Sequence, residues 1–241
     1  MKINQRFFRF RLRAFLVLLT ILCIWLGKIS VEARKQREAV AWVRKHQGEV
    51  RYDTTFDRPT AKYAEHASSV PEWLQELLGE DYFRTVSHVT IFKAPLNDIS
   101  PLTGLKGLRE LELISTGVKD VAPLARLTHL THLSLARNHI EDLAPLQRLT
   151  RLVSLNVVDN EVTDISSLSA LKNLTSLVAG NNKIRNIAPL KNLHSLEHLY
   201  LPNNLVSDLS VLSGLPNLER VEVNGNPVDA EEARKYPAIV N

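Results

Sequence analysis

A short motif returns every 22 residues along most of this chain, and this period constrains the fold more than any other feature. The motif is an Asp or Asn, an aliphatic residue, two variable residues and a Leu. It begins at Asp98, Asp120, Asp142, Asp164, Asn186 and Asp208. A fixed period of about 20 to 29 residues is typical of a chain that winds into a stack of equivalent coils. We therefore expect a solenoid in which each coil buries its leucines against its neighbours.

The residue pattern within each coil predicts its secondary structure. Apolar residues that alternate, such as Leu133 and Leu135, predict a short half-buried strand. Three residues after the second apolar position comes an asparagine, whose amide can bond backbone groups in the turn. These asparagines are Asn138, Asn160, Asn182, Asn204 and Asn226. The repeated motif then closes the other side, where prolines favour tight turns over a long helix. The sequence thus predicts an α/β-type solenoid with a parallel concave sheet of about seven short strands.

The first fifty residues differ in charge from the rest. They hold eleven Lys or Arg against three Asp or Glu, whereas the remaining residues hold nineteen against twenty-three. The basic balance therefore belongs to the N-terminal tail, and nucleic-acid binding by the folded part is not expected. The one cysteine, Cys23, excludes an intrachain disulfide, so the core must stabilise the fold.

An uncharged run of fourteen residues, Ala14–Gly27, follows five basic residues. The run can continue to Val31 if the Lys28 side chain extends to the membrane interface. Its length then reaches the roughly 17 to 25 residues of a spanning helix. We predict a transmembrane signal-anchor over residues 14–31, with the repeat domain on the extracytoplasmic (periplasmic) side. The alternative is a cleaved signal peptide, which would leave the repeat protein secreted.

The remaining segments are expected to cap the stack or tether it. Ser69 and Glu72 form a capping box ahead of apolar residues, which predicts an N-terminal capping helix. The expected order is a basic tail (1–13), the anchor (14–31), a charged juxtamembrane helix and tether with one strand at most (32–68), the capping helix (69–84), the repeats (85–228) and a C-terminal capping segment (229–241).

The spacing N-x-[IV]-x-D-[ILV]-x-P-L resembles the internalin-type leucine-rich repeats of bacteria, and also the repeats of a eukaryotic phosphatase regulatory subunit. The stretches "ARKQREAV" and "PEWLQELLGEDYF" behind a short anchor resemble the membrane-anchored leucine-rich-repeat proteins of planctomycete bacteria. The resemblance implies a leucine-rich-repeat horseshoe that serves as a curved binding scaffold, with no catalytic residues.

The strand residues that point out of the concave face form columns, and one column is largely apolar. An exposed apolar row on a sheet can mark an interaction surface. The strands alone cover some 460 Å², less than the roughly 800 Å² per partner of a standard interface, so loop residues such as Arg137 are expected to contribute. The candidate protein-binding residues are Phe92, Ile114, His132, Arg137, Val158, Val178, His198 and Tyr200.

Neither an enzyme nor a metal or cofactor protein is expected. His132 and His198 are three coils apart, roughly 14 Å by strand spacing, whereas zinc lies about 2.1 Å from its ligands. The Asp residues of the motif occur once per coil, which makes them turn formers and not a carboxylate pair. The sequence therefore predicts a non-enzymatic, membrane-anchored protein-binding scaffold. The alternative is a regulatory subunit that binds an intracellular enzyme such as a phosphatase.

Overall fold

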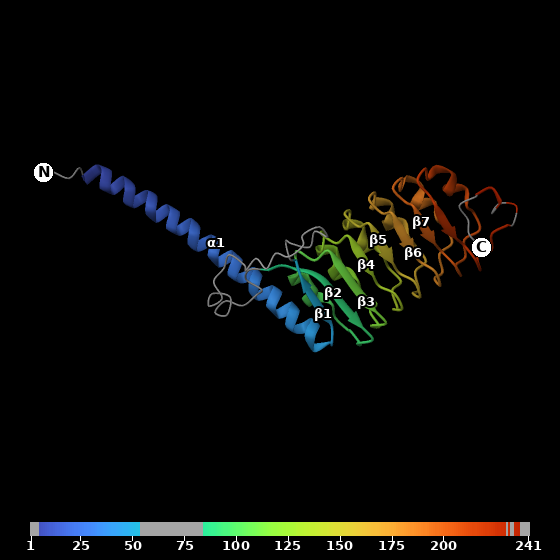
Figure 1. Ribbon diagram of the computed structural model, residues 1–241, viewed down its shortest axis with the longest axis horizontal. Coiled ribbons are helices and arrows are strands. Elements are labelled where there is room, and N and C mark those ends of the chain that lie inside the picture. Colours follow the sequence, from blue (N-terminus) through green and yellow to red (C-terminus); the bar gives the residue numbers. More distant parts are fainter. Residues whose placement is uncertain (1–4, 54–83, 230, 232–233, 237–241) are drawn as a thin grey trace, which may run out of the picture.

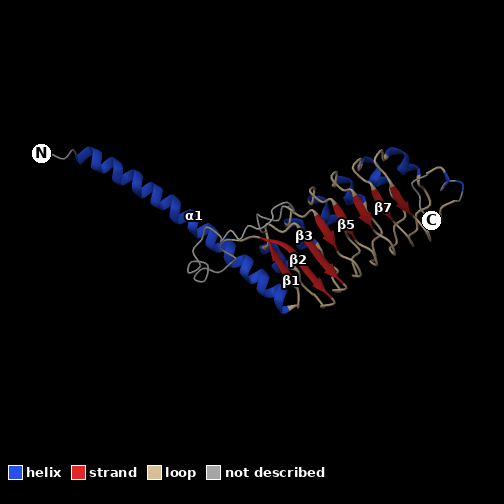
Figure 2. Cartoon of the chain, viewed as in Figure 1, coloured by secondary structure: helices blue, strands red, loops and turns tan. Residues whose placement is uncertain are grey.

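The computed structural model describes residues 5–53, 84–229, 231 and 234–236, with only a few side chains described before residue 30. Residues 84–229 wind into a stack of coils, from which the long helix α1 (Gln5–Lys45) extends (Figure 1). One strand per coil lines one face of the stack, and short helical turns line the opposite face (Figure 2). The predicted solenoid is confirmed.

The strands form one sheet in chain order. They are β1 (Glu49–Tyr52), β2 (Val86–Phe92), β3 (Glu110–Ile114), β4 (His132–Ser134), β5 (Ser154–Asn156), β6 (Ser176–Val178), β7 (His198–Tyr200) and β8 (Arg220–Glu222). From β2 to β8 the pairing is parallel, and each residue pairs with the residue 22 positions later, as Leu133 does with Leu155. The seven predicted parallel strands are therefore confirmed. β1 adds an antiparallel edge strand next to β2.

Short 3₁₀ helices form the convex side. They are η2 (Ser100–Gly104), η3 (Ala122–Arg126), η4 (Ala144–Arg148), η5 (Ser166–Ala170), η6 (Ala188–Asn192) and η7 (Ser210–Gly214). In each coil the motif Asp or Asn accepts the backbone N–H two residues later, at 2.7 to 2.9 Å. The motif residues are turn formers, as predicted.

The repeat leucines make one continuous core. In the coil that begins near Thr150, six apolar side chains are completely buried, namely Leu152, Leu155, Val157, Val162, Ile165 and Leu168. They belong to a single cluster that extends through all the coils. Burial on this scale requires neighbours on both sides, because a single coil has no second layer to cover its leucines.

The asparagines form a buried ladder along one edge of the stack. Asn160 Oδ1 accepts the N–H of Ile140 in the preceding coil at 3.0 Å. Its Nδ2 donates to Leu135 O in the preceding coil and to Val157 O in its own coil, at 2.9 and 3.1 Å. Asn138, Asn182, Asn204 and Asn226 repeat this pattern. The ladder therefore satisfies buried backbone groups that no strand partner reaches.

The C-terminal part of α1 covers the N-terminal end of the core. Ala39, Val40 and Val43 are buried and belong to the same hydrophobic cluster as the repeat leucines. Buried Gln36 donates to Arg84 O at 2.7 Å and accepts the N–H of Val86 at 3.2 Å, which ties the helix to the start of β2. Residues 32–45, expected to lie beside a membrane, thus also cap the solenoid.

Several sequence predictions fall on residues outside the described part of the chain. The predicted capping helix, 69–84, lies almost wholly there, as does most of the C-terminal segment 229–241. Within that segment, the N–H of Glu231 donates to Asp229 Oδ1 at 2.7 Å, and Tyr236 packs partly buried against the core.

The expected transmembrane span falls inside α1, mostly on residues whose side chains are not described. Among the described residues, no helix has a long enough apolar stretch to cross a bilayer.

Candidate concave interaction surface

The parallel register brings equivalent residues of successive coils into columns across the concave face. The middle column is Thr90, Glu112, Ser134, Asn156, Val178, Tyr200 and Glu222, and each member pairs with the next. The column on one side of it runs from His88 to Arg220 in the same register. Phe92 pairs with Ile114 at the start of the third column. Because side chains alternate along a strand, these residues point away from the buried leucines.

The candidate residues near the C-terminal end of the face form a cluster. Val178 pairs with Tyr200 on the neighbouring strand. The His198 and Tyr200 rings lie 6.4 Å apart, and the Arg220 guanidinium lies 5.8 Å from the centre of the Tyr200 ring. Tyr and Arg are enriched among the residues that dominate binding energy at protein interfaces.

Phe92 lies at the other end of the face and is half exposed, at 50%. The Lys93 ammonium lies 5.0 Å from the centre of the Phe92 ring. Five strand spacings separate β2 from β7, so Phe92 and Tyr200 are about 24 Å apart along the stack. His132 and Arg137, from the middle of the stack, are both exposed, and Ile114 and Val158 are half-buried.

The apolar row expected along the third column is interrupted. Ala136 is only 6% exposed and Gly180 is also buried, so neither offers a contact surface. A Cβ built on Gly180 would lie 2.8 Å from Pro202 Cγ, which shows that Pro202 packs directly on this glycine. Apolar contacts in this column are therefore confined to its other members, which include Phe92, Ile114 and Val158.

A column of residues with left-handed backbone borders the face and was missed at the sequence level. Its members precede the ladder positions by one residue and have φ between 53° and 58°: Lys93, Ser115, Arg137, Asp159, Asn181 and Asn203. Some of these side chains link across coils. Arg137 Nε lies 3.4 Å from Asp159 Oδ2, and Asn181 donates to Asp159 Oδ1 at 2.5 Å. The 22-residue period was the signal that could have revealed this column, because its members occur once per coil, directly before the ladder position.

A second polar network lies at the N-terminal end of the face. His88 Nδ1 lies 2.7 Å from Glu110 Oε2, and His88 Nε2 lies 2.9 Å from Thr90 Oγ1. Thr90 Oγ1 in turn lies 3.4 Å from Glu112 Oε2. Within the described ranges, no group of three or more His, Cys, Asp or Glu side chains could hold a metal ion. The network therefore offers hydrogen-bonding groups at this end of the face.

One strand, one ladder position and one 3₁₀ turn per 22-residue coil define a leucine-rich-repeat solenoid. The family model "Leucine Rich repeats (2 copies)" matches residues 150–192 and 194–233. The chain belongs to the leucine-rich-repeat proteins. No curated protein matches it.

Two solved structures show which leucine-rich-repeat proteins this chain is similar to. The crystal structure of an internalin C2 from Listeria monocytogenes is 33% identical, with a TM-score of 0.60, over 64% of this chain and 68% of that one. A leucine-rich-repeat protein of Leptospira interrogans is 29% identical, with a TM-score of 0.53, over 56% of this chain and 36% of that one. The predicted resemblance to internalins is confirmed.

Proposed function

We propose that this protein is a non-enzymatic scaffold that binds a protein ligand through its concave face. The observation that carries the proposal is the cluster of Val178, His198 and Tyr200, with Arg220 against the Tyr200 ring. A rigid aromatic ring beside a guanidinium provides large contact area together with hydrogen-bond donors, which is the usual chemistry of an interface anchor. Leucine-rich-repeat domains in general bind proteins, which agrees with this assignment.

The concave columns have the geometry that an extended interface needs. The strand backbones hold Phe92 and Tyr200 on one sheet. A ligand that contacts both residues therefore loses little binding free energy to the ordering of this protein. Exposed Arg137 and half-buried Asp159, which border the same face, enlarge the contact beyond the strands.

The test is capture of native ligand by the full chain in neutral detergent. Val158→Asp and Tyr200→Ala remove apolar contacts from the concave face, and Gln147→Ala and Ser169→Ala change exposed positions on the convex side. We expect both concave variants to capture at least tenfold less ligand, with the convex variants equal to wild type. All four should keep the wild-type melting temperature. Unchanged capture by both concave variants would remove the case for this surface.

We further propose that residues 14–31 anchor the protein in a membrane, with the repeats on the extracytoplasmic side. The support is the charge-free run Ala14–Gly27 behind five basic residues, together with the resemblance to anchored planctomycete proteins. Protease added to spheroplasts, whose outer membrane has been opened, should digest the repeats, whereas a protected repeat domain would contradict this placement. Release of the full-length chain from membranes by carbonate would contradict the anchor itself.

A further inference from the structure

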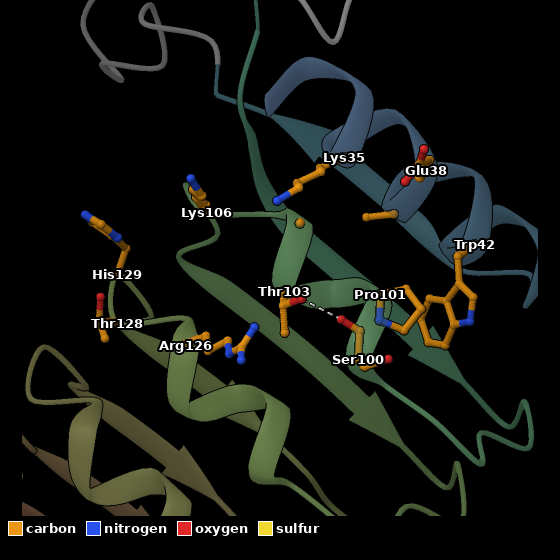
Figure 3. A pocket seen from close by; sticks show the side chains of 12 residues that line it. Lys35, Glu38, Trp42, Ser100, Pro101, Thr103, Lys106, Arg126, Thr128 and His129 are labelled. Carbon is orange, nitrogen blue, oxygen red and sulfur yellow. Dashed lines mark hydrogen bonds between the residues drawn. The ribbon is translucent and has the colours of Figure 1, made fainter. Parts of the chain in front are cut away.

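A groove lies on the convex side, between α1 and the first two 3₁₀ turns. Its volume is about 720 Å³. Small-molecule sites in proteins commonly have volumes of about 300 to 1,000 Å³. Figure 3 shows Lys35 and Trp42 from α1 on one wall, and Thr103, Lys106 and Arg126 on the other.

The groove exists because α1 approaches η2 very closely at one point. A Cβ built on Gly104 would lie 2.6 Å from the carbonyl oxygen of Lys35, so only glycine permits this contact. Lys35, Ala39 and Trp42, spaced four and three residues apart, share the helix face that lines the opening.

Three basic side chains, Lys35, Lys106 and Arg126, line the groove. Lys106 pairs with Glu32 at 2.8 Å. Neither Lys35 nor Arg126 has an ion-pair partner among the described residues. Glu38 also lines the groove, and its carboxylate lies 3.9 Å from Arg34. An anion that enters between Lys35 and Arg126 would therefore meet positive potential on both walls.

We propose that this groove binds a phosphate-bearing anion between Lys35 and Arg126. A guanidinium offers paired N–H donors that match two phosphate oxygens, and the Lys35 ammonium supplies a point charge from the other wall. The hydroxyl of Thr128 and the imidazole of His129 line the same side as Arg126 and add polar contacts. Trp42 gives an apolar surface for the carbon skeleton that carries the phosphate.

The phosphate could belong to a lipid headgroup or to a soluble phosphate ester, and the position along α1 bears on the choice. Lys35 lies four residues beyond Val31, which is about 6 Å along a helix. A headgroup layer is roughly 5 to 8 Å thick on each side of the hydrocarbon. If residues 14–31 are in a bilayer, the groove therefore lies at the depth of the lipid phosphates. The groove chemistry itself does not depend on that anchor.

The experiment uses the full chain with two probes, in neutral detergent for calorimetry and after detergent removal for flotation. Titration calorimetry measures binding of glycerol 3-phosphate, and flotation measures binding to phosphatidylcholine vesicles with or without about one-fifth phosphatidylglycerol. The test variant combines Lys35→Gln with Arg126→Gln. The control combines Arg185→Gln with Lys191→Gln, which removes the same charge from exposed positions far from α1. Circular dichroism verifies that both variants are folded.

We expect wild type and control to bind a probe, and the test variant to bind it about tenfold or more weakly, since each basic residue contributes about a factor of five near an anionic surface. Binding of glycerol 3-phosphate supports a soluble ester, and preference for the anionic vesicles alone supports a lipid headgroup. Absence of both, or equal losses in test and control variants, would overturn the proposal. This experiment contains no protein ligand of the concave face. A negative result would therefore not bear on the proposed protein binding.

Discussion

Asn138 Oδ1 accepts hydrogen bonds from both the N–H and the hydroxyl of Thr116, one coil earlier, at 3.0 and 2.9 Å. Thr116 occupies the position where later coils have the ladder asparagine, and its side chain is 1% exposed. A hydroxyl thus ends the ladder toward the N-terminus without leaving the Asn138 carbonyl unpaired. The ladder is a continuous structural element, and each rung supports the coil before it.

Asn160→Ala should destabilise the protein by about 2 kcal/mol. The carbonyls that Asn160 contacts keep second donors, since Asn182 also donates to Val157 O and Asn138 to Leu135 O. The N–H of Ile140 has Asn160 Oδ1 as its partner and would be left buried and unpaired. Urea unfolding measures the loss. The exposed Asn192→Ala serves as control and should change stability by less than about 0.5 kcal/mol. Equal effects would contradict the role of the ladder.

Gly104→Ala should weaken the packing of α1 on the first coil. The new methyl group would meet the carbonyl oxygen of Lys35 at 2.6 Å, and backbone has little freedom to yield. Overpacking of this kind costs about 1 to 3 kcal/mol. Gly214 is the equivalent residue five coils later, and its nearest neighbour would be Lys191 O at an ordinary 3.8 Å. Gly214→Ala should therefore be neutral or slightly stabilising. Hydrogen exchange of residues 33–45 should accelerate only in Gly104→Ala.

Replacing Ser115 with glycine should leave stability within about 0.5 kcal/mol of wild type. Ser115 has φ of 55°, a conformation that costs an L-residue about 1 kcal/mol and glycine almost nothing, and this gain offsets the greater freedom of glycine in the unfolded chain. Ser134 is in the extended strand β4, where glycine should cost about 0.5 to 1 kcal/mol. A larger loss for Ser115→Gly than for Ser134→Gly in thermal unfolding would refute this account of the column.

Stability should fall as the solution becomes acidic. Hydrogen bonds from the backbone N–H and the hydroxyl of Ser166 hold the pKa of Asp164 below its ordinary value of 3.8. Since the folded state lowers the pKa, the stabilisation is fully present above 3.8 and is lost as the pH falls through the folded value. Asp98 and Asp208 have lowered pKa values for the same reason.

The matched variant for this pH dependence is Asp164→Asn. It keeps an acceptor for Ser166, as Asn186 does for Ala188 in its own coil at 2.9 Å, but it does not titrate in acid. The urea midpoint of wild type should decline between about pH 5 and pH 2.5, and that of the variant should decline less steeply. Parallel curves for the two proteins would show that Asp164 makes no contribution to the pH dependence of stability.

The repeat period was sufficient to predict the solenoid, its seven parallel strands and the ladder, because each coil imposes the same burial on equivalent positions. It did not predict how α1 closes the stack. Gln36 is buried through hydrogen bonds to backbone at Arg84 and Val86, about fifty positions away, and no local pattern encodes such a contact. The apolar face of α1 was also hard to recognise in the sequence, because Ala39, Val40 and Val43 are small and lie between many charged residues.

For the candidate site, the sequence predicted which residues share a column, since the strand register follows from the period. The sequence overestimated how many members of the apolar column are exposed, because the exposure of each residue depends on the neighbouring coil. Gly180 is covered by Pro202, which is 22 residues later, and Ala136 is too short to project from the face. The links from Arg137 and Asn181 to Asp159 depend on left-handed backbone, which none of these residue types requires.

Site-specific photocrosslinking tests most directly which face of the solenoid contacts the ligand. A benzophenone side chain would replace Val178 or Tyr200 on the concave face, and Gln147 or Ser169 on the convex side, in the full chain with native ligand. The account predicts one common adduct from Val178 and Tyr200 and none from the other two positions. Adducts of that ligand from Gln147 and Ser169, without any from the concave positions, would contradict it.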